Sequence, residues 1–176
     1  GGSLEKYLLG TNNSDDFTRI FFINANTGYA VRNFGRYYKT TNGGQFWVYK
    51  SLTGDYINDF IYYSNSFYKI GSAQDGNNFW RPAVWSSSDE NNWSSPDLCL
   101  TCGTNTYGIK LNFFDTTKYL IRGDYPTPGA GNRIYKNSPQ GWASIGSGQP
   151  LSIGFSNNGK FVCYGYYDNA FSYLMS

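Results

Sequence analysis

The chain has 176 residues, of which 20% are aromatic and 21 are glycine, and its formal net charge is +2. It contains no histidine, which excludes a Ser-His-Asp or Cys-His catalytic arrangement and any histidine-ligated metal site. Because it has neither a block of basic residues nor an apolar run as long as a membrane span, we expect no nucleic-acid partner and no membrane insertion.

In chain order, Gly1-Gly2-Ser3 is interpreted as a remnant of cloning, and residues 4–10 predict an isolated β-strand. The rest of the chain alternates between apolar stretches and turn residues in four units, as expected for short strands. The predicted strands are 17–23, 28–32, 36–40 and 46–50; then 57–63, 66–71, 83–87 and one from Trp93; then 108–114, 119–122, 133–136 and one from Trp142; and finally 151–155, 161–164 and 170–175.

A turn followed by a tryptophan recurs in three of these units. The first copy is Lys39-Thr40-Thr41-Asn42-Gly43-Gly44-Gln45-Phe46-Trp47, the second is Ser87-Ser88-Asp89-Glu90-Asn91-Asn92-Trp93, and the third is Lys136-Asn137-Ser138-Pro139-Gln140-Gly141-Trp142. The tryptophans are 46 and 49 residues apart. A period of this length in β-rich sequence is typical of propeller blades and similar repeats.

The residue types in these turns have a physical role. An Asn or Asp oxygen can fold back onto backbone N–H groups, a Ser or Thr hydroxyl can add a further bond, and glycine tolerates positive φ. The tryptophan can then cover the turn from the apolar side. We therefore predict structural roles for Thr40, Asn42, Gly44, Trp47, Ser87, Asp89, Trp93 and Trp142. The alternative for any single copy is an ordinary hairpin beside a chance tryptophan.

The first copy resembles the Asp-box (BNR) repeat, Ser/Thr-x-Asp-x-Gly-x-x-Trp, with Asn42 in place of the aspartate. Together with Gly28-Tyr29-Ala30-Val31, it is similar to the repeats of photosystem II assembly factor-type propellers. The second copy is one residue shorter and lacks the glycine, and the third keeps little beyond Trp142. The resemblance implies a propeller fold, but Asp-box proteins include both enzymes and binding modules.

We therefore predict an all-β chain, a β-propeller of four-stranded antiparallel blades forming a single domain over residues 4–176. The expected blades are 17–50, 57–97, 107–146, and 150–176 completed by 4–10, so that the amino-terminal strand closes the last sheet and removes two exposed edges. Two alternatives stay open, a fragment of a larger propeller and pairing with a second chain. The oligomeric state is also left open.

The cysteines predict neither a metal site nor a cofactor. Cys99-Leu100-Thr101-Cys102 is either a small loop disulfide or a pair of inert thiols, because only one further cysteine and no histidine could complete a ligand set. Cys163 lies in an apolar strand and is expected to be a buried thiol.

Catalysis by a pair of carboxylates finds little support. Glutamate occurs only at Glu5 and Glu90, and Arg19-Ile20-Phe21 lacks the proline of the Arg-Ile-Pro-type motif that the resemblance to Asp-box sialidases would imply. We therefore expect no enzymatic activity, with a reduced glycoside hydrolase as the least favoured hypothesis.

The resemblance implies that loops joining the second and third strands gather on the face opposite the Asp-box turns. Aligning the second strands places Arg32, Arg122 and Tyr164 at equivalent positions. The candidate ligand-binding residues are Arg32, Arg36, Asp75, Trp80, Arg81, Arg122, Asp124, Tyr125, Tyr164, Tyr167 and Asp168. Aromatic rings beside charged and amide groups suit a sugar or a protein partner. The alternative for each aromatic residue is simple packing between blades.

The leading hypothesis is a non-catalytic recognition module for a glycan or a cell-surface component, at an extracellular, envelope or virion-surface location. This includes a phage-tail or an extracellular bacterial protein. The alternative is a protein-binding assembly scaffold, which the similarity of the segment from Gly28 to Trp47 to assembly-factor repeats favours.

Overall fold

The computed structural model describes residues 17–32, 34–52, 56–124, 131–147, 149–155, 161–167 and 170–175. For the described residues after 145, it gives the backbone alone, except at Ile153, whose side chain is also described. These residues form fifteen β-strands, and their one helical element is a 3-10 turn, η1 (Leu100–Cys102). The predicted amino-terminal strand, residues 4–10, lies outside the described residues, so its closing role stays a prediction.

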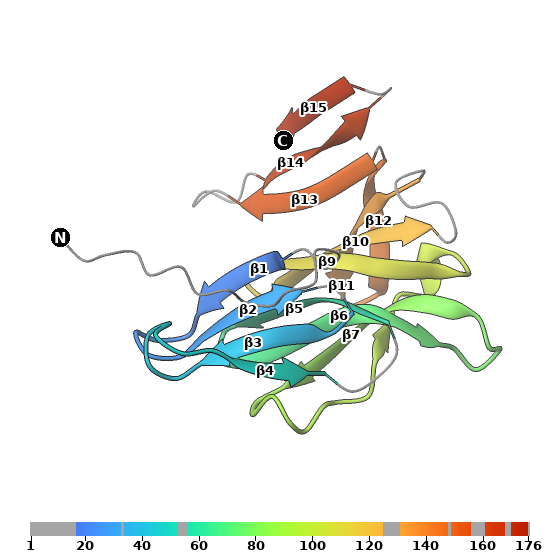
Figure 1. Ribbon diagram of the computed structural model, residues 1–176. Helices are drawn as coiled ribbons and strands as arrows, with labels where there is room; N and C mark the ends of the chain where they lie inside the picture. Colours follow the sequence, from blue (N-terminus) through green and yellow to red (C-terminus); the bar gives the residue numbers. More distant parts are fainter. Residues whose placement is uncertain are drawn as a thin grey trace.

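The strands form four antiparallel sheets, each following the order of the chain (Figure 1). The first sheet contains β1 (Phe17–Phe22), β2 (Gly28–Arg32), β3 (Arg36–Thr40) and β4 (Val48–Ser51). The second contains β5 (Ile57–Tyr63), β6 (Ser66–Gln74), β7 (Trp80–Ser87) and β8 (Asp97–Leu98). The third contains β9 (Thr106–Phe114), β10 (Thr117–Asp124), β11 (Arg133–Ser138) and β12 (Gly141–Ser147). The fourth contains β13 (Gln149–Phe155), β14 (Phe161–Tyr167) and β15 (Ala170–Met175).

Every sheet has an irregularity at the same place in its first strand. The pairing of the first and second strands skips one residue, which is Thr18, Asn58, Ile109 or Leu151 in the successive sheets. Such a β-bulge leaves one residue without a cross-strand partner and bends the strand. Its recurrence makes the four sheets structural repeats whose positions can be matched residue by residue.

The first strands of successive sheets contact one another, β1 with β5, β5 with β9, and β9 with β13. Buried aromatic residues fill the space between the first two sheets, including Tyr29, Phe60 and Phe67. Between the second and third sheets, the aliphatic Leu111 and Leu120 pack together with aromatic residues such as Phe113. Each sheet is therefore held by the next through side chains that alternate along its strands.

The strand predicted from Trp93 is wrong, because β8 begins only at Asp97. Before it, the backbone N–H of Ser94 bonds the carbonyl of Ser86, and the N–H of Ser86 bonds the hydroxyl of Ser94 at 3.0 Å. A side chain thus takes the place of a backbone acceptor, and Pro96 has no N–H to continue the ladder. Both features delay the outer strand by four residues.

The alternative left open for the cysteines is resolved, since Cys99 and Cys102 form a disulfide across η1. Both are buried against the interface of the second and third sheets. Among the described residues, no group of three or more possible metal ligands is found. In the same part of the chain, no helix has the length and hydropathy needed to cross a membrane.

Candidate functional site

The turn between β3 and β4 is held by two side chains. The buried Thr40 hydroxyl donates to Oδ1 of Asn42 at 2.9 Å and accepts the N–H of Gly44 at 2.9 Å. Oδ1 of Asn42 also accepts the N–H of Phe46 at 2.9 Å. Gly44 has a φ of 92°, a conformation that glycine adopts without strain. The Trp47 indole lies against this glycine and meets the Phe22 ring edge-on, with centroids 6.1 Å apart.

The turn between β7 and β8 repeats this arrangement with an aspartate. The Ser87 hydroxyl donates to Asp89 Oδ1 at 2.9 Å, and the same oxygen accepts the N–H groups of Asn91 and Asn92 at 2.9 and 2.8 Å. These bonds, with another from the Asn92 amide, hold the pKa of Asp89 well below its usual range. Trp93 follows the turn and meets the Phe60 ring at 6.2 Å.

The third tryptophan follows a tighter turn. Ser138 and Gly141 form the last pair between β11 and β12, and Gly141 has a φ of 103°. Trp142 is buried and its indole N–H donates to Asp97 at 3.1 Å. All three tryptophans thus follow the turn between the third and fourth strands of a sheet, although their surroundings differ.

The pH dependence of stability tests the second turn. Because the pKa of Asp89 is lower in the folded protein, its stabilising effect is complete above the ordinary carboxyl pKa of about 4 and is lost as the pH falls. We expect Asp89→Asn to weaken the fall in melting temperature between pH 7 and about pH 3, since asparagine keeps the acceptor but does not titrate. A fall in melting temperature as large as that of the wild type would contradict the stabilising role of the Asp89 carboxylate. Melting curves at both pH values measure it.

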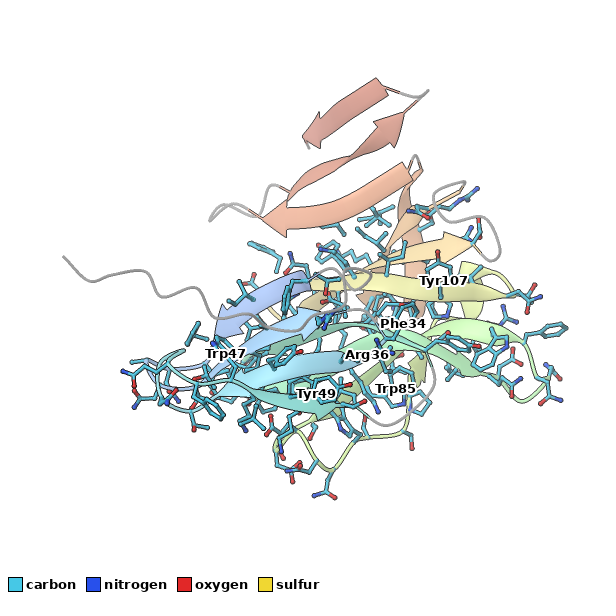
Figure 2. All side chains as sticks on the ribbon, in the orientation of Figure 1. Phe34, Arg36, Trp47, Tyr49, Trp85 and Tyr107 are labelled. Carbon is cyan, nitrogen blue, oxygen red and sulfur yellow. A yellow bond between two sulfur atoms is a disulfide. The ribbon has the colours of Figure 1, made fainter. Side chains whose placement is uncertain are left out.

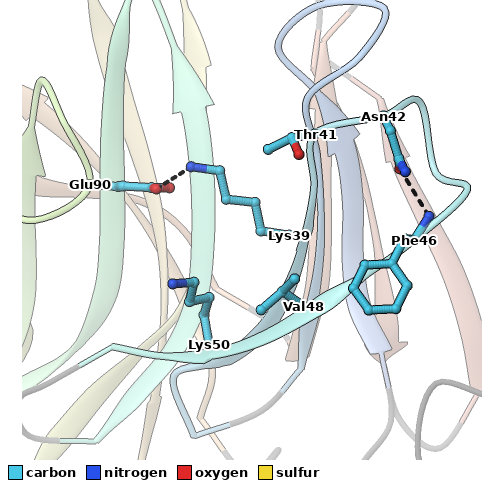
Figure 3. A pocket seen from close by; sticks show the side chains of 7 residues that line it. All are labelled: Lys39, Thr41, Asn42, Phe46, Val48, Lys50 and Glu90. Carbon is cyan, nitrogen blue, oxygen red and sulfur yellow. Dashed lines mark hydrogen bonds and ion pairs between the residues drawn. The ribbon is translucent and has the colours of Figure 1, made fainter.

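A pocket of about 280 Å³ opens beside the first turn, between the first two sheets (Figure 3). Its lining residues are Lys39, Thr41, Asn42, Phe46, Val48, Lys50 and Glu90. Glu90 forms an ion pair with Lys39 and accepts the Tyr29 hydroxyl at 2.7 Å. Burial, followed by this bond to Glu90, raises the pKa of Tyr29, and burial raises the pKa of Tyr37 to about 12. The Glu90 carboxylate, in the loop after β7, therefore links the second sheet to Tyr29 and Lys39 of the first sheet. Both of its oxygens bond to residues of the protein itself.

The opposite ends of the sheets carry the loops between second and third strands. Figure 2 shows Phe34 and Arg36 at the far end of the first sheet from Trp47. In the second sheet, Asp75 accepts the N–H groups of Asn77 and Phe79 at 2.8 and 3.1 Å. Arg81 donates to Asp75 at 2.9 Å, which is the main reason that the pKa of Asp75 is lowered. The ion pair fixes the arginine at the base of the loop.

Exposed aromatic residues surround this loop. The Phe34, Tyr56 and Phe79 side chains are 60%, 65% and 43% exposed. The guanidinium groups of two arginines lie over two of these rings, Arg36 over Phe34 at 6.0 Å and Arg81 over Phe79 at 5.9 Å. Trp80 meets Tyr56 edge-on at 5.4 Å. We call these residues, Phe34, Arg36, Tyr56, Phe79, Trp80 and Arg81, the loop surface.

Backbone bonds attach residues on both sides of the connection between the first two sheets to the ends of those sheets. The N–H of Leu52 bonds the carbonyl of Gly35 at 2.7 Å, which joins the first loop to the connection between the sheets. The N–H of Ser72 bonds the carbonyl of Tyr56 at 3.2 Å, which joins that connection to β6. The predicted candidates Asp75, Trp80 and Arg81 therefore share the second loop, and Arg36 lies in the first sheet, where the neighbouring Gly35 abuts Ile57 at the start of β5. The exposed Phe34, Tyr56 and Phe79 were not among the predicted candidates.

The remaining candidates lie elsewhere or outside the described residues. Arg32 is buried with its guanidinium over the Phe17 ring at 5.6 Å, and Arg122 forms an ion pair with Asp124 along β10. The bulge matches Arg32 with Arg122, but the matching position in the fourth sheet is Gly165, so the predicted equivalence of Tyr164 is wrong by one residue. Tyr125, Asp168 and the side chains of Tyr164 and Tyr167 lie outside what the structure describes.

Sequence reasoning missed a charged cluster between the first strands. Arg19 makes two bonds to Asp59, at 3.0 and 2.7 Å, and a third to the carbonyl of Leu111 at 3.2 Å. Asp59 is 1% exposed. Lys110 follows the bulge just as Arg19 and Asp59 do, and burial lowers its pKa while the charge of Asp59 opposes the shift. The shared position after the bulge was the signal, and it becomes visible only once the strand pairing is known.

No protein-family model and no curated protein sequence matches the chain. Among solved structures, the chain is similar to one described as "YCF48 bound to D1 peptide", with a TM-score of 0.57 and 16% identity over 92% of this chain. The chain has a β-propeller fold. The predicted fold class is thereby confirmed. The match covers 53% of the other chain, so this chain spans about half the length of that protein.

Proposed function

We propose that this protein is a non-catalytic, protein-binding module that holds an extended peptide segment on the loop surface. The observation that carries the proposal is the run of exposed aromatic rings braced by two arginines. Tyr, Trp and Arg are the residues most often responsible for binding energy at protein interfaces. The similar YCF48 structure is described as bound to a peptide, which favours the assembly-scaffold hypothesis over glycan binding.

The geometry supports a preorganised surface. Asp75 holds Arg81 at 2.9 Å, and Arg81 also donates to the carbonyl of Leu100 at 3.2 Å, so the guanidinium is fixed before a ligand arrives. Fixing a side chain in advance lowers the entropy lost on binding. A peptide with apolar side chains and a carboxylate would pair its apolar groups with the rings and its charge with the arginines.

Two finer assignments belong to this proposal. The bonds of Thr40 and Asn42 support classification of the first turn as an Asp-box, which gives it a structural role at the end opposite the loop surface. An extracellular, envelope or virion-surface location also stays a proposal, based on the tyrosine-, asparagine- and glycine-rich composition.

A peptide library panned on the purified chain, followed by calorimetry on the selected peptides, tests the function. We expect Trp80→Ala and Tyr56→Ala each to weaken binding about ten- to a hundredfold, the usual cost of losing an aromatic anchor. Phe46→Ala is the matched control, because Phe46 is 65% exposed at the other end of the first sheet. Failure to select any peptide, together with glycan-array binding that Trp80→Ala abolishes, would instead establish the glycan hypothesis.

A further inference from the structure

The face of the first sheet that points away from the second sheet has exposed side chains on its outer strands, among the residues that the structure describes, while the small Ala30 between them is 2% exposed. Ile20 pairs with Ala30, Ala30 with Tyr38, and Tyr38 with Tyr49, so these four residues form one row across all four strands. Ile20 is 66% exposed and Tyr49 is 53% exposed. Tyr29, Val31 and Tyr37, on the alternate positions, are buried against the second sheet. We call the row, with Phe17 and Phe22, the outer face; both added residues are 47% exposed.

The repeats show what normally covers this face. Matched through the bulge, Ile20 corresponds to Phe60, Leu111 and Ile153 in the later sheets. Those three residues are 0%, 0% and 7% exposed. Phe60 packs on Tyr29 of the first sheet, and Ile153 packs on Ile121 and Ile134 of the third. In each case the preceding sheet provides the cover. Ile20 therefore has the apolar side chain of an inter-sheet contact, but no sheet among the described residues buries it.

We propose that a second copy of this chain covers the outer face, with its fourth sheet, β13–β15, packed on the first sheet as the third packs on the fourth. If the fourth sheet of each copy packs on the first sheet of the other, the two copies form one ring with twofold symmetry. Eight sheets lie within the range of four to eight blades typical of propellers.

The aromatic character of the outer face fits a sheet as its occupant. Phe17 and Tyr38 lie 6.2 Å apart and Tyr38 and Tyr49 lie 5.6 Å apart, so the rings already form a continuous layer. A neighbouring sheet buries such a layer along its whole length, as the second sheet does with Tyr29 and Tyr37 on the other side. A loop or a single peptide would leave part of the row in water.

Light scattering on the 176-residue chain tests the proposal. We expect a mass twice the 19.8 kDa of one chain, and a mass of one chain for Ile20→Arg. Phe46→Arg is the control, since Phe46 is equally exposed, 65% against 66%, but lies in the turn before β4. Circular dichroism should show the same β-sheet signal for both variants. A wild-type monomer at all concentrations, or a dimer that Ile20→Arg leaves intact, overturns the proposal.

A cysteine experiment separates the ring from a dimer in which two first sheets face each other. In a Cys163→Ser background, Ile20→Cys should give no covalent dimer on mild oxidation, because the two first sheets of the ring each contact a fourth sheet. A disulfide between the two introduced cysteines would show a symmetric pairing of outer faces and would overturn the ring arrangement.

Discussion

Replacing Phe60 with alanine is expected to lower the free energy of unfolding by about 3–5 kcal/mol. Phe60 is fully buried, and its ring lies 5.2 Å from Tyr37, 5.6 Å from Tyr29 and 5.6 Å from Phe67. These partners come from both the first and the second sheet, so the cavity left by alanine would lie between two sheets whose backbones are fixed by their own ladders. Such a site collapses poorly, which places the cost at the upper end for a core residue.

The expected loss is a large part of the total stability, since domains of this size are stable by about 5–15 kcal/mol. Urea unfolding followed by tryptophan fluorescence measures it, because Trp93 lies against the Phe60 ring. Phe46→Ala is the control and should change stability by less than about 0.5 kcal/mol, as an exposed residue does. A similar value for the two variants would mean that the first two sheets do not unfold as one unit.

The fold could be predicted because its strongest signals are local. Alternating apolar residues and turn residues place most of the fifteen described strands, and the turn at Thr40 and Asn42 depends on side chains within seven residues of one another. The strand from Trp93 failed because a serine side chain and a proline interrupt the ladder there, and neither is visible as a break in hydrophobicity.

The candidate site was only partly predictable, for a different reason. Asp75 and Arg81 could be picked as loop residues by aligning the second strands, but their ion pair is seen only in the structure. The exposure of Tyr56 depends on the path between two sheets, and the pairing of Arg19 with Asp59 joins residues 40 apart in the chain. Contacts of this kind depend on the order of sheets and on the bulge, which sequence periodicity does not specify.

Replacing Arg19 with methionine is expected to destabilise the protein by about 3–5 kcal/mol, the usual cost of removing one partner of a buried ion pair. Asp59 is 1% exposed, so its buried carboxyl group would lose the two bonds that Arg19 now donates. Arg19 also donates to the carbonyl of Leu111, so the variant loses a contact that spans three sheets. Urea unfolding at neutral pH measures the change.

Two further variants decide whether burial is the cause. Lys118→Met breaks the ion pair between Lys118 and Asp97, in which the two side chains are 26% and 39% exposed. This substitution should lower the free energy of unfolding by no more than about 1 kcal/mol. Removing both charges, in Arg19→Met with Asp59→Leu, should recover much of the loss, because the unpaired carboxylate is then gone. If the double variant is as unstable as the sum of its single variants, the two residues act independently, and the first strands are held together by apolar packing alone.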